Sequence, residues 1–170
     1  MARALIVGCG CFGTEVGRLL AGDGWAVRGT SRTVEGASRV EAAGLEAAQA
    51  DPDRVGTVLE QVGDVTVVVW ALAAASGDTA EAVNGPRLER TLERLVDTPV
   101  RGFVLDAGSG LSAGDSAGGG LDPEVRREAV ALLEAAERTW RIPTRVVEAQ
   151  RGDGWTAAMA SAANGLLAPA

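Results

Sequence analysis

The sequence contains no lysine, no histidine and no tyrosine, and all 16 of its basic residues are arginine. It has only two cysteines, Cys9 and Cys11. Two thiols without any histidine cannot supply the ligand set of a structural or catalytic zinc site. We therefore expect no bound metal.

Long apolar runs and clusters of basic residues are also missing. No run reaches the roughly 20 apolar residues of a membrane span, and a strand-like run at residues 4–7 leaves no room for a signal peptide. The formal net charge is −7, and the arginines are scattered, which is unlike a nucleic-acid surface. We expect one domain over residues 1–170, soluble and cytoplasmic, with no nucleic-acid or membrane partner.

The most informative segment that is present is a glycine-rich turn at residues 8–13. It fits the pattern G-x-G-x-x-G, follows the apolar run at 4–7 and leads into a helical pattern. In such a unit the first glycine permits the turn, the second lets a pyrophosphate approach, and the third allows the helix to pack on the strand. The turn predicts nucleotide binding; the alternative is a tight turn without a ligand. The candidate residues are Gly8, Cys9, Gly10, Cys11, Phe12 and Gly13.

Cys9 and Cys11 lie within this turn, one residue apart. That spacing is poorly suited to an unstrained disulfide. We interpret both as small residues packed beside the phosphates. A redox role is the alternative, because the N-terminus of a helix can lower the pKa of a thiol.

A second turn, after an expected strand at residues 25–30, bears on the choice of cofactor. NAD sites usually carry Asp or Glu about 20 residues beyond the glycine turn, where the carboxylate accepts hydrogen bonds from the ribose. This chain has Thr30, Ser31 and Arg32 there. Hydroxyl groups and a guanidinium can bind a 2′-phosphate, so the sequence predicts NADP(H) rather than NAD(H). The alternative is that Arg32 is only solvated and Thr33 only caps the next helix.

Two more segments are candidates for cofactor contacts. Asp51 and Pro52 follow an expected strand at residues 45–50, and we interpret Asp51 as the cap of the next helix, with a contact to adenine compatible with that role. Ala71, Leu72 and Ala73 follow the β-branched run at residues 65–70, which predicts a central strand buried on both faces. Their small side chains leave room for a ribose, although ordinary packing explains them almost as well.

Strand and helix patterns alternate along the whole chain. Further strands are expected at residues 102–106 and 144–148, a polar connection at 76–84 and a flexible Gly/Ser-rich loop at 107–121. Asp122 and Pro123 have the pattern of a helix start. The sequence therefore predicts an α/β, three-layer, doubly wound Rossmann fold with a parallel sheet of about six strands in the order 3-2-1-4-5-6.

The chain resembles the short-chain dehydrogenase/reductase superfamily, in its extended and atypical NAD(P)-binding branch of epimerase, dehydratase and reductase-like proteins. The resemblance covers nearly the whole chain. It implies pyrophosphate at the glycine turn, 2′-phosphate at Ser31 and Arg32, adenine near Asp51, and ribose or nicotinamide near residues 71–73. The segments that carry the resemblance are residues 7–13, 28–32, 50–52, 67–73 and 102–109.

The chain departs from this family in two respects. The family's Tyr-x-x-x-Lys pair is absent, because the chain has neither residue type, and Arg126 and Arg127 near the corresponding helix start cannot shuttle protons. Ser109 matches the family's catalytic serine in position, but the chain offers it no base. Extended members also continue into a substrate-binding portion, which the resemblance implies is truncated here.

These departures leave three functional hypotheses. The first is a catalytically degenerate NADP(H)-binding protein that acts as a cofactor sensor or an interaction module, with a homodimer or another protein as partner. The second is a small NADP-dependent oxidoreductase, or an epimerase or dehydratase-like enzyme, that works without the usual pair. The third is an S-adenosylmethionine-dependent methyltransferase, which the missing acidic residue after residue 30 disfavours.

Overall fold

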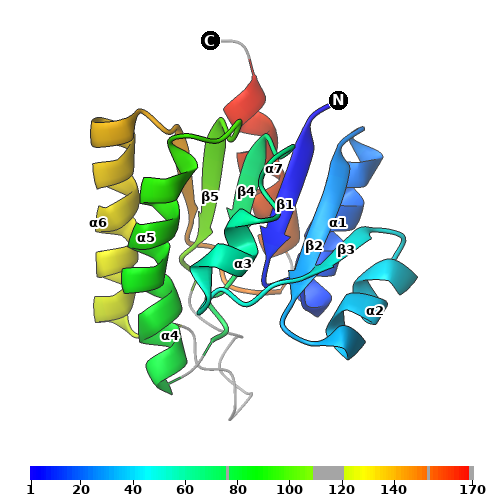
Figure 1. Ribbon diagram of the computed structural model, residues 1–170, viewed down its shortest axis with the longest axis horizontal. Coiled ribbons are helices and arrows are strands. Elements are labelled where there is room, and N and C mark those ends of the chain that lie inside the picture. Colours follow the sequence, from blue (N-terminus) through cyan, green and yellow to red (C-terminus); the bar gives the residue numbers. More distant parts are fainter. Residues whose placement is uncertain (76, 109–120, 153, 169–170) are drawn as a thin grey trace.

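The structure, a computed structural model, describes residues 1–75, 77–108, 121–152 and 154–168. Its strands form one parallel sheet in the order β3-β2-β1-β4-β5-β6, which confirms the predicted fold class (Figure 1). In chain order the elements are β1 (Arg3–Val7), α1 (Cys11–Gly22), β2 (Ala26–Ser31), α2 (Val34–Ala42), β3 (Glu46–Gln49), α3 (Val55–Leu59), β4 (Val67–Trp70), α4 (Gly77–Asn84), α5 (Pro86–Leu95), β5 (Gly102–Asp106), α6 (Pro123–Trp140), β6 (Thr144–Val147) and α7 (Trp155–Leu167).

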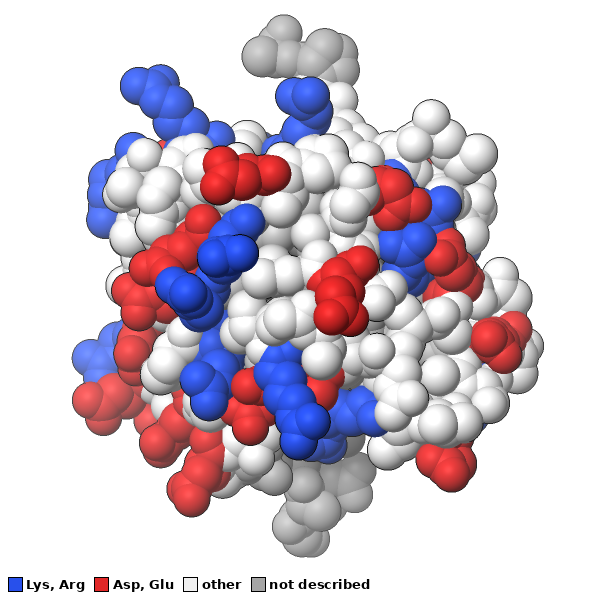
Figure 2. Space-filling view, in the orientation of Figure 1, with Lys and Arg blue, Asp and Glu red and all other residues white. Residues whose placement is uncertain are grey.

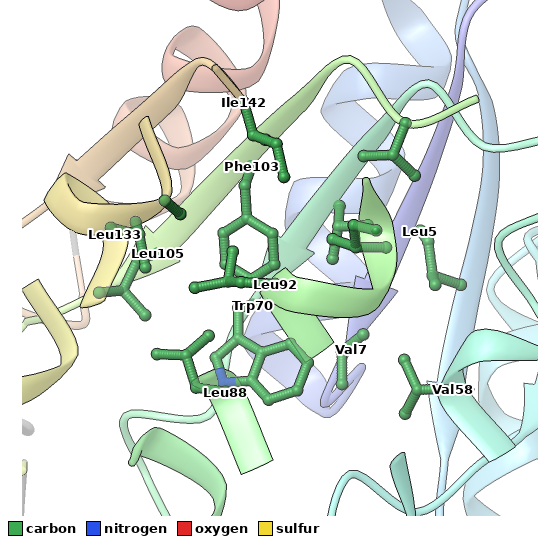
Figure 3. Close-up of a cluster of buried hydrophobic side chains, with 14 of the residues drawn as sticks. Leu5, Val7, Val58, Trp70, Leu88, Leu92, Phe103, Leu105, Leu133 and Ile142 are labelled. Carbon is green, nitrogen blue, oxygen red and sulfur yellow. The ribbon is translucent and has the colours of Figure 1, made fainter. Parts of the chain in front are cut away.

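The central strand β4 is buried on both faces, as its continuous β-branched run predicts. Its four residues are each 0% exposed. Val67 and Val69 pack with side chains of α1 and α7, whereas Val68 and Trp70 pack with side chains of α3, α5 and α6. Figure 3 shows the second of these clusters around Trp70 and Phe103. Helices thus cover both faces of the sheet and leave the strand ends as the places where a site can form.

The segment after β3 does not begin a helix at Pro52, so the prediction that Asp51 is a helix cap is wrong. Helix α3 begins at Val55, and Oδ1 of Asp51 accepts a hydrogen bond from the amide of Asp53 at 3.0 Å. The Thr57 hydroxyl accepts from the Asp51 amide at 2.8 Å and donates to the Asp51 carbonyl at 3.0 Å. These local side-chain bonds stabilise a turn instead of a helical first turn.

The prediction of a polar connection at residues 76–84 is also wrong for the described residues of that segment, because Gly77–Asn84 forms helix α4. Its inner residues Ala80, Val83 and Asn84 are buried. The Asn84 amide donates to the carbonyls of Leu72 at 3.3 Å and Ala80 at 3.1 Å. Packing against α5 and α6 supplies the stability that the polar sequence of this short helix does not indicate.

The glycine-rich loop expected at residues 107–121 is anchored at both ends. Ala107 is 0% exposed and donates from its amide to the Val147 carbonyl at 2.9 Å, and Leu121 is 3% exposed. Residues 109–120 lie outside the described residues. The next helix starts as predicted, because Oδ1 of Asp122 accepts from the Glu124 amide at 2.8 Å.

Charged side chains of both signs are interspersed on the surface that α5 and α6 form (Figure 2). Ion pairs there include Arg90 with Glu93 at 3.2 Å and Arg138 with Glu134 at 4.0 Å. Neighbouring acidic groups therefore offset these arginines. Among the described residues no helix is both long enough and apolar enough to cross a membrane.

The amino-terminal ends of β1, β2 and β3 carry a cluster of paired charges. Arg28 donates to Glu46 at 2.7 Å and to Asp64 at 2.8 Å, and Arg3 pairs with the same two carboxylates. The hydrogen bond from Arg28 holds the pKa of Asp64 below its usual value. This cluster ties the edge of the sheet together at the end opposite to the carboxyl ends of the strands.

We expect Asp64→Asn to lower the free energy of unfolding near neutral pH by less than about 1 kcal/mol, because Asp64 is half exposed. A carboxyl whose pKa is lower when folded stabilises the protein above its unfolded pKa, and this stabilisation is lost as the pH falls through the folded pKa. The difference between wild type and variant, measured by urea unfolding, should therefore shrink toward zero under acid conditions. Asp97→Asn, on an exposed residue, is the control. A pH-independent difference would contradict the role of Asp64.

Candidate functional site

A cleft of about 840 Å³ opens at the carboxyl ends of β1, β2 and β4. In parallel α/β sheets this is where ligands bind, at the point where the strand order reverses on either side of β1. The glycine turn, the ends of β2 and β3, and the segment after β4 form its walls. The lining residues are Gly8, Cys9, Gly10, Cys11, Thr14, Glu15, Arg18, Thr30, Ser31, Arg32, Gly36, Arg39, Ala42, Ala43, Ala50, Asp51, Pro52, Ala71, Leu72, Ala74, Ala75, Thr79, Val83 and Arg151.

The glycine turn has the geometry that its pattern predicts. Gly8 has φ of +84°, and a Cβ on Gly13 would lie 3.1 Å from the Gly8 carbonyl oxygen, so the helix packs closely on the strand. A Cβ on Gly10 would meet nothing within 4 Å, which leaves the backbone there open to the cleft. The turn is therefore accessible at its second glycine and closely packed at its first and third.

Helix α1 begins at this turn without a capping side chain. Gly10 is its N-cap, no side chain of the described residues accepts a hydrogen bond there, and the first helical hydrogen bond runs from Thr14 to Gly10 at 2.9 Å. The amides of the first turn thus have no partner within the helix. Unpaired amides and the helix dipole together favour an anion at this end.

The two cysteines of the turn differ in environment. Cys9 is 6% exposed, and burial raises the pKa of its thiol, so it stays protonated near neutral pH. Its Sγ lies 3.8 Å from the Thr14 hydroxyl. Cys11 is exposed on the cleft wall, and both cysteines are free thiols. Cys9 therefore behaves as a small packed residue.

The end of β2 places Thr30, Ser31 and Arg32 on the cleft wall. Thr30 is buried and supports the glycine turn, because its carbonyl accepts from the Cys9 amide at 2.9 Å and its hydroxyl from the Gly8 amide at 3.4 Å. Arg32 is exposed, and the carbonyl of Arg32 accepts a hydrogen bond from Gln49 at 3.0 Å. Thr33 caps α2 by accepting from the Gly36 amide at 3.0 Å, the role that the alternative interpretation gave it.

Asp51 and Pro52 lie on the wall beyond β3, and Ala71 and Leu72 on the wall beyond β4. The Asp51 carboxylate keeps Oδ2 available, because its one hydrogen bond among the described residues is made by Oδ1. Ala73 does not line the cleft but packs with Ala80, Leu121 and Val125. The small residues after β4 thus divide between the cleft and the core.

Two residues of the glycine turn also lie outside the cleft lining. Gly13 is buried in the contact between α1 and β1, and Phe12 packs edge-on against Trp155 with ring centroids 5.8 Å apart. The predicted catalytic candidate Ser109 lies outside the described residues. The predicted residues that do converge on the cleft come from the ends of β1, β2, β3 and β4.

Arg151 is a cleft residue that the sequence pattern did not indicate. It follows β6, and its Nη2 donates to the Ala71 carbonyl at 3.1 Å and to Oδ2 of Asp106 at 2.9 Å. Asp106 ends β5 and is 0% exposed. The pair is separated by 45 residues, so no local spacing could have predicted it.

Arg39 and Gly36 on α2 were missed as well. Both line the cleft beside Arg32, and Arg39 is exposed with no ion pair among the described residues. Arg39 stands seven residues after Arg32, and a helical reading of residues 34–43 could have placed it near that end of the cleft. The structure therefore brings two arginines to the end of β2.

No protein-family model matches the chain, and no curated protein matches it. Solved structures do resemble it. UDP-glucuronic acid 4-epimerase from Bacillus cereus in complex with NAD is 16% identical with a TM-score of 0.62, and 87% of this chain aligns with 56% of that one. For the UDP-glucose 4-epimerase of Thermus thermophilus in complex with NAD the identity is 17%, the TM-score 0.66, and the coverage 86% and 54%.

The chain spans about half the length of these epimerases. A protein of Aeromonas hydrophila subsp. hydrophila ATCC 7966, assigned to the oxidoreductases of the short chain dehydrogenase/reductase family, aligns over much more of its length. Its identity is 14% and its TM-score 0.69, and 100% of this chain covers 93% of that one. The chain therefore has the α/β Rossmann fold of these epimerase and dehydrogenase/reductase structures, as the resemblance predicted.

Proposed function

We propose that this protein binds a nicotinamide dinucleotide in the cleft at the carboxyl ends of β1, β2 and β4. The carrying observation is the turn at Gly8–Gly10, where open backbone lies in the cleft beside the start of α1, whose first-turn amides have no partner within the helix. This arrangement suits a diphosphate. Both epimerase structures described above are complexes with NAD, which supports the same class of ligand here.

Within that class we favour NADP(H). Ser31, Arg32 and Arg39 stand together where the adenosine ribose of a dinucleotide would lie, and no Asp or Glu occupies residues 30–33. A carboxylate at this position would repel a 2′-phosphate, whereas guanidinium groups donate charge-assisted hydrogen bonds to it. Asp51 is the candidate for the adenine, since its Oδ2 is available.

The proposed role is cofactor binding without the family's usual catalysis, as in a sensor of NADP(H) or a module that interacts with another protein. The chain supplies no tyrosine, lysine or histidine for acid–base chemistry. Burial raises the pKa of Cys9, and arginine does not release its proton near neutral pH. The cleft thus holds groups that bind a cofactor and lacks the family's proton-transfer pair.

A small NADP-dependent oxidoreductase is the second candidate. It is favoured by the Aeromonas hydrophila protein, because that structure is of similar length and its family assignment is to oxidoreductases. Hydride transfer to an easily reduced acceptor does not require a positioned acid, whose contribution is roughly 10²- to 10⁴-fold. Oxidation of NADPH by carbonyl, enone or imine compounds, followed at the absorbance of the reduced nicotinamide, would favour this candidate over a sensor.

A fluorescence titration tests the proposed ligand. Trp155 lies against Arg151 on the cleft wall, so reduced nicotinamide bound in the cleft should quench tryptophan emission by energy transfer. We expect saturable binding of NADPH, and weaker binding of NADH. Absence of saturable binding for both nucleotides would contradict the proposed function, and equal affinity for both would contradict the preference for NADP(H).

Arg32→Ala should weaken NADPH binding by about 1.5–3 kcal/mol, roughly 10- to 100-fold, because a charge-assisted contact to the 2′-phosphate is lost. NADH has no such phosphate, so its affinity should stay within about twofold. The two affinities are measured by the same titration. Arg94→Ala, in the last turn of α5 and outside the cleft lining, is the control for the loss of one positive charge. Equal losses for both nucleotides would rule out contact between Arg32 and the 2′-phosphate.

A further inference from the structure

Arg151 has the most constrained side chain on the cleft wall. Its side chain is 12% exposed, and its guanidinium carbon lies 5.6 Å from the ring centroid of Phe12 and 5.0 Å from that of Trp155. Phe12 belongs to the first turn of α1, and Trp155 begins α7. The guanidinium is therefore held between the helix start that follows the glycine turn and the helix that follows β6.

Asp106 fixes this guanidinium in place. Its Oδ1 accepts from the Trp155 indole at 3.1 Å and from the Gly108 amide at 3.1 Å, and its Oδ2 accepts from Arg151 at 2.9 Å. These three donors fix the orientation of the buried carboxylate. Asp106 is thus a positioning residue, and Arg151 is the member of the pair that reaches the cleft.

Only one nitrogen of Arg151 is engaged by the described part of the protein. Nη2 makes both hydrogen bonds of the guanidinium, while Nη1 makes none there and the buried Nε has no partner among the same residues. A guanidinium carries five N–H donors. Because Nε is buried and Nη2 is already engaged, Nη1 is the nitrogen left to donate to a ligand that accepts hydrogen bonds.

Among the described residues, the other arginines that line the cleft do not contact the region between the first turn of α1 and the end of β4. Arg18 pairs with Glu15 at 2.7 Å, and Arg32 and Arg39 stand at the end of β2 and on α2. Arg151 is the cleft arginine that contacts both the first turn of α1 and the end of β4. That is the region of the glycine turn, where a diphosphate would be bound by the amides of α1.

We infer that Arg151 binds the diphosphate of the dinucleotide, with Asp106 holding the guanidinium toward it. The inference rests on the proposed function and adds a cation to the amides of α1. The chain has no lysine that could supply this charge. A guanidinium also matches the planar, two-oxygen geometry of a phosphate group.

The test compares two probes on one double variant. Arg151→Met alone would leave the buried Asp106 charge unpaired, so the variant to use is Asp106→Asn with Arg151→Met, which removes both charges and keeps an oxygen for Trp155 and Gly108. NADPH carries the diphosphate, whereas adenosine 2′-monophosphate has the 2′-phosphate but no diphosphate. We expect the variant to bind NADPH roughly 10- to 100-fold more weakly and adenosine 2′-monophosphate within about twofold of wild type, both by calorimetry.

Arg90→Met is the matched control, because it removes an exposed arginine that Glu93 already pairs and that lies outside the cleft lining, and its NADPH affinity should change by less than about twofold. Wild-type affinity of the double variant for NADPH would overturn the role of Arg151 and leave the proposed function intact. An equal loss of affinity for NADPH and for adenosine 2′-monophosphate would also overturn that role, because the substitutions would then have altered the whole cleft. Failure of wild type to bind NADPH would overturn the proposed function itself.

Discussion

Gly8→Ala should lower the free energy of unfolding by about 2–5 kcal/mol and weaken NADPH binding by roughly tenfold or more. Gly8 has φ of +84°, a conformation that costs an L-residue energy. An added Cβ would also lie 2.5 Å from Cδ2 of Leu72 and 2.9 Å from the carbonyl oxygen of Ala71. The carbonyl of Ala71 belongs to the backbone just after β4 and cannot rotate away as a side chain can. The clash can therefore be relieved only if the glycine turn moves away from β4.

The measurements are urea unfolding for stability and tryptophan quenching for NADPH. Gly24→Ala is the matched control for conformation, because Gly24 has φ of +92° but no atom within 4 Å of its added Cβ. Gly24→Ala should lower the free energy of unfolding by only about 1–2 kcal/mol and leave the affinity for NADPH unchanged. If Gly8→Ala lowers the free energy of unfolding and the NADPH affinity no more than Gly24→Ala does, the contact with the end of β4 does not constrain the turn.

Gly10→Ala separates binding from folding at the same turn. Gly10 has φ of −81° and its added Cβ would meet no atom within 4 Å, so the free energy of unfolding should fall by no more than about 1 kcal/mol, the cost of alanine at an N-cap. The new methyl group would stand in the open part of the cleft where the diphosphate is proposed to approach. Unchanged NADPH affinity would contradict binding at this backbone.

Trp70→Ala should destabilise the fold by about 3–5 kcal/mol, the range for removing a large aromatic side chain from a packed core. Trp70 is 0% exposed, and its indole donates a hydrogen bond to the Val83 carbonyl at 3.2 Å. Its ring centroid lies 5.9 Å from that of Phe103, with the two rings tilted by 34°. Figure 3 shows its ring among the side chains that join the sheet to α5. Loss of the Trp70 side chain would leave a cavity in the core beside β4, the strand that leads to Ala71 on the cleft wall.

Urea unfolding again gives the size of the effect, and two variants separate its causes. Trp70→Phe keeps a ring and loses the hydrogen bond to Val83, so it should cost less than Trp70→Ala. Trp140→Ala removes a partly exposed indole and should also cost less, since less apolar surface returns to water. A loss for Trp70→Ala no larger than that of Trp140→Ala would show that β4 is not the centre of the core.

The correct and the wrong predictions differ in the range of the interactions on which they depend. The strand patterns, the backbone geometry of the glycine turn and the Asp122 cap were confirmed, because each depends on neighbours within a few residues. The predicted Asp51 cap was wrong because the Thr57 hydroxyl bonds both the amide and the carbonyl of Asp51 and holds the segment in a turn, so that α3 begins only at Val55. Helix α4 was missed because its stability comes from packing on α5 and α6.

The sequence by itself determined the order of the strands, the position of the glycine turn and the absence of tyrosine, lysine and histidine. These follow from composition, periodicity and right-handed crossovers. Only the tertiary structure decided which side chains meet in the cleft. Arg39 joined Arg32 because α2 folds back beside β2, and Arg151 joined Asp106 and Phe12 because α1, β5 and α7 converge there. The contacts of Arg151 join residues so far apart that they leave no local pattern in the chain.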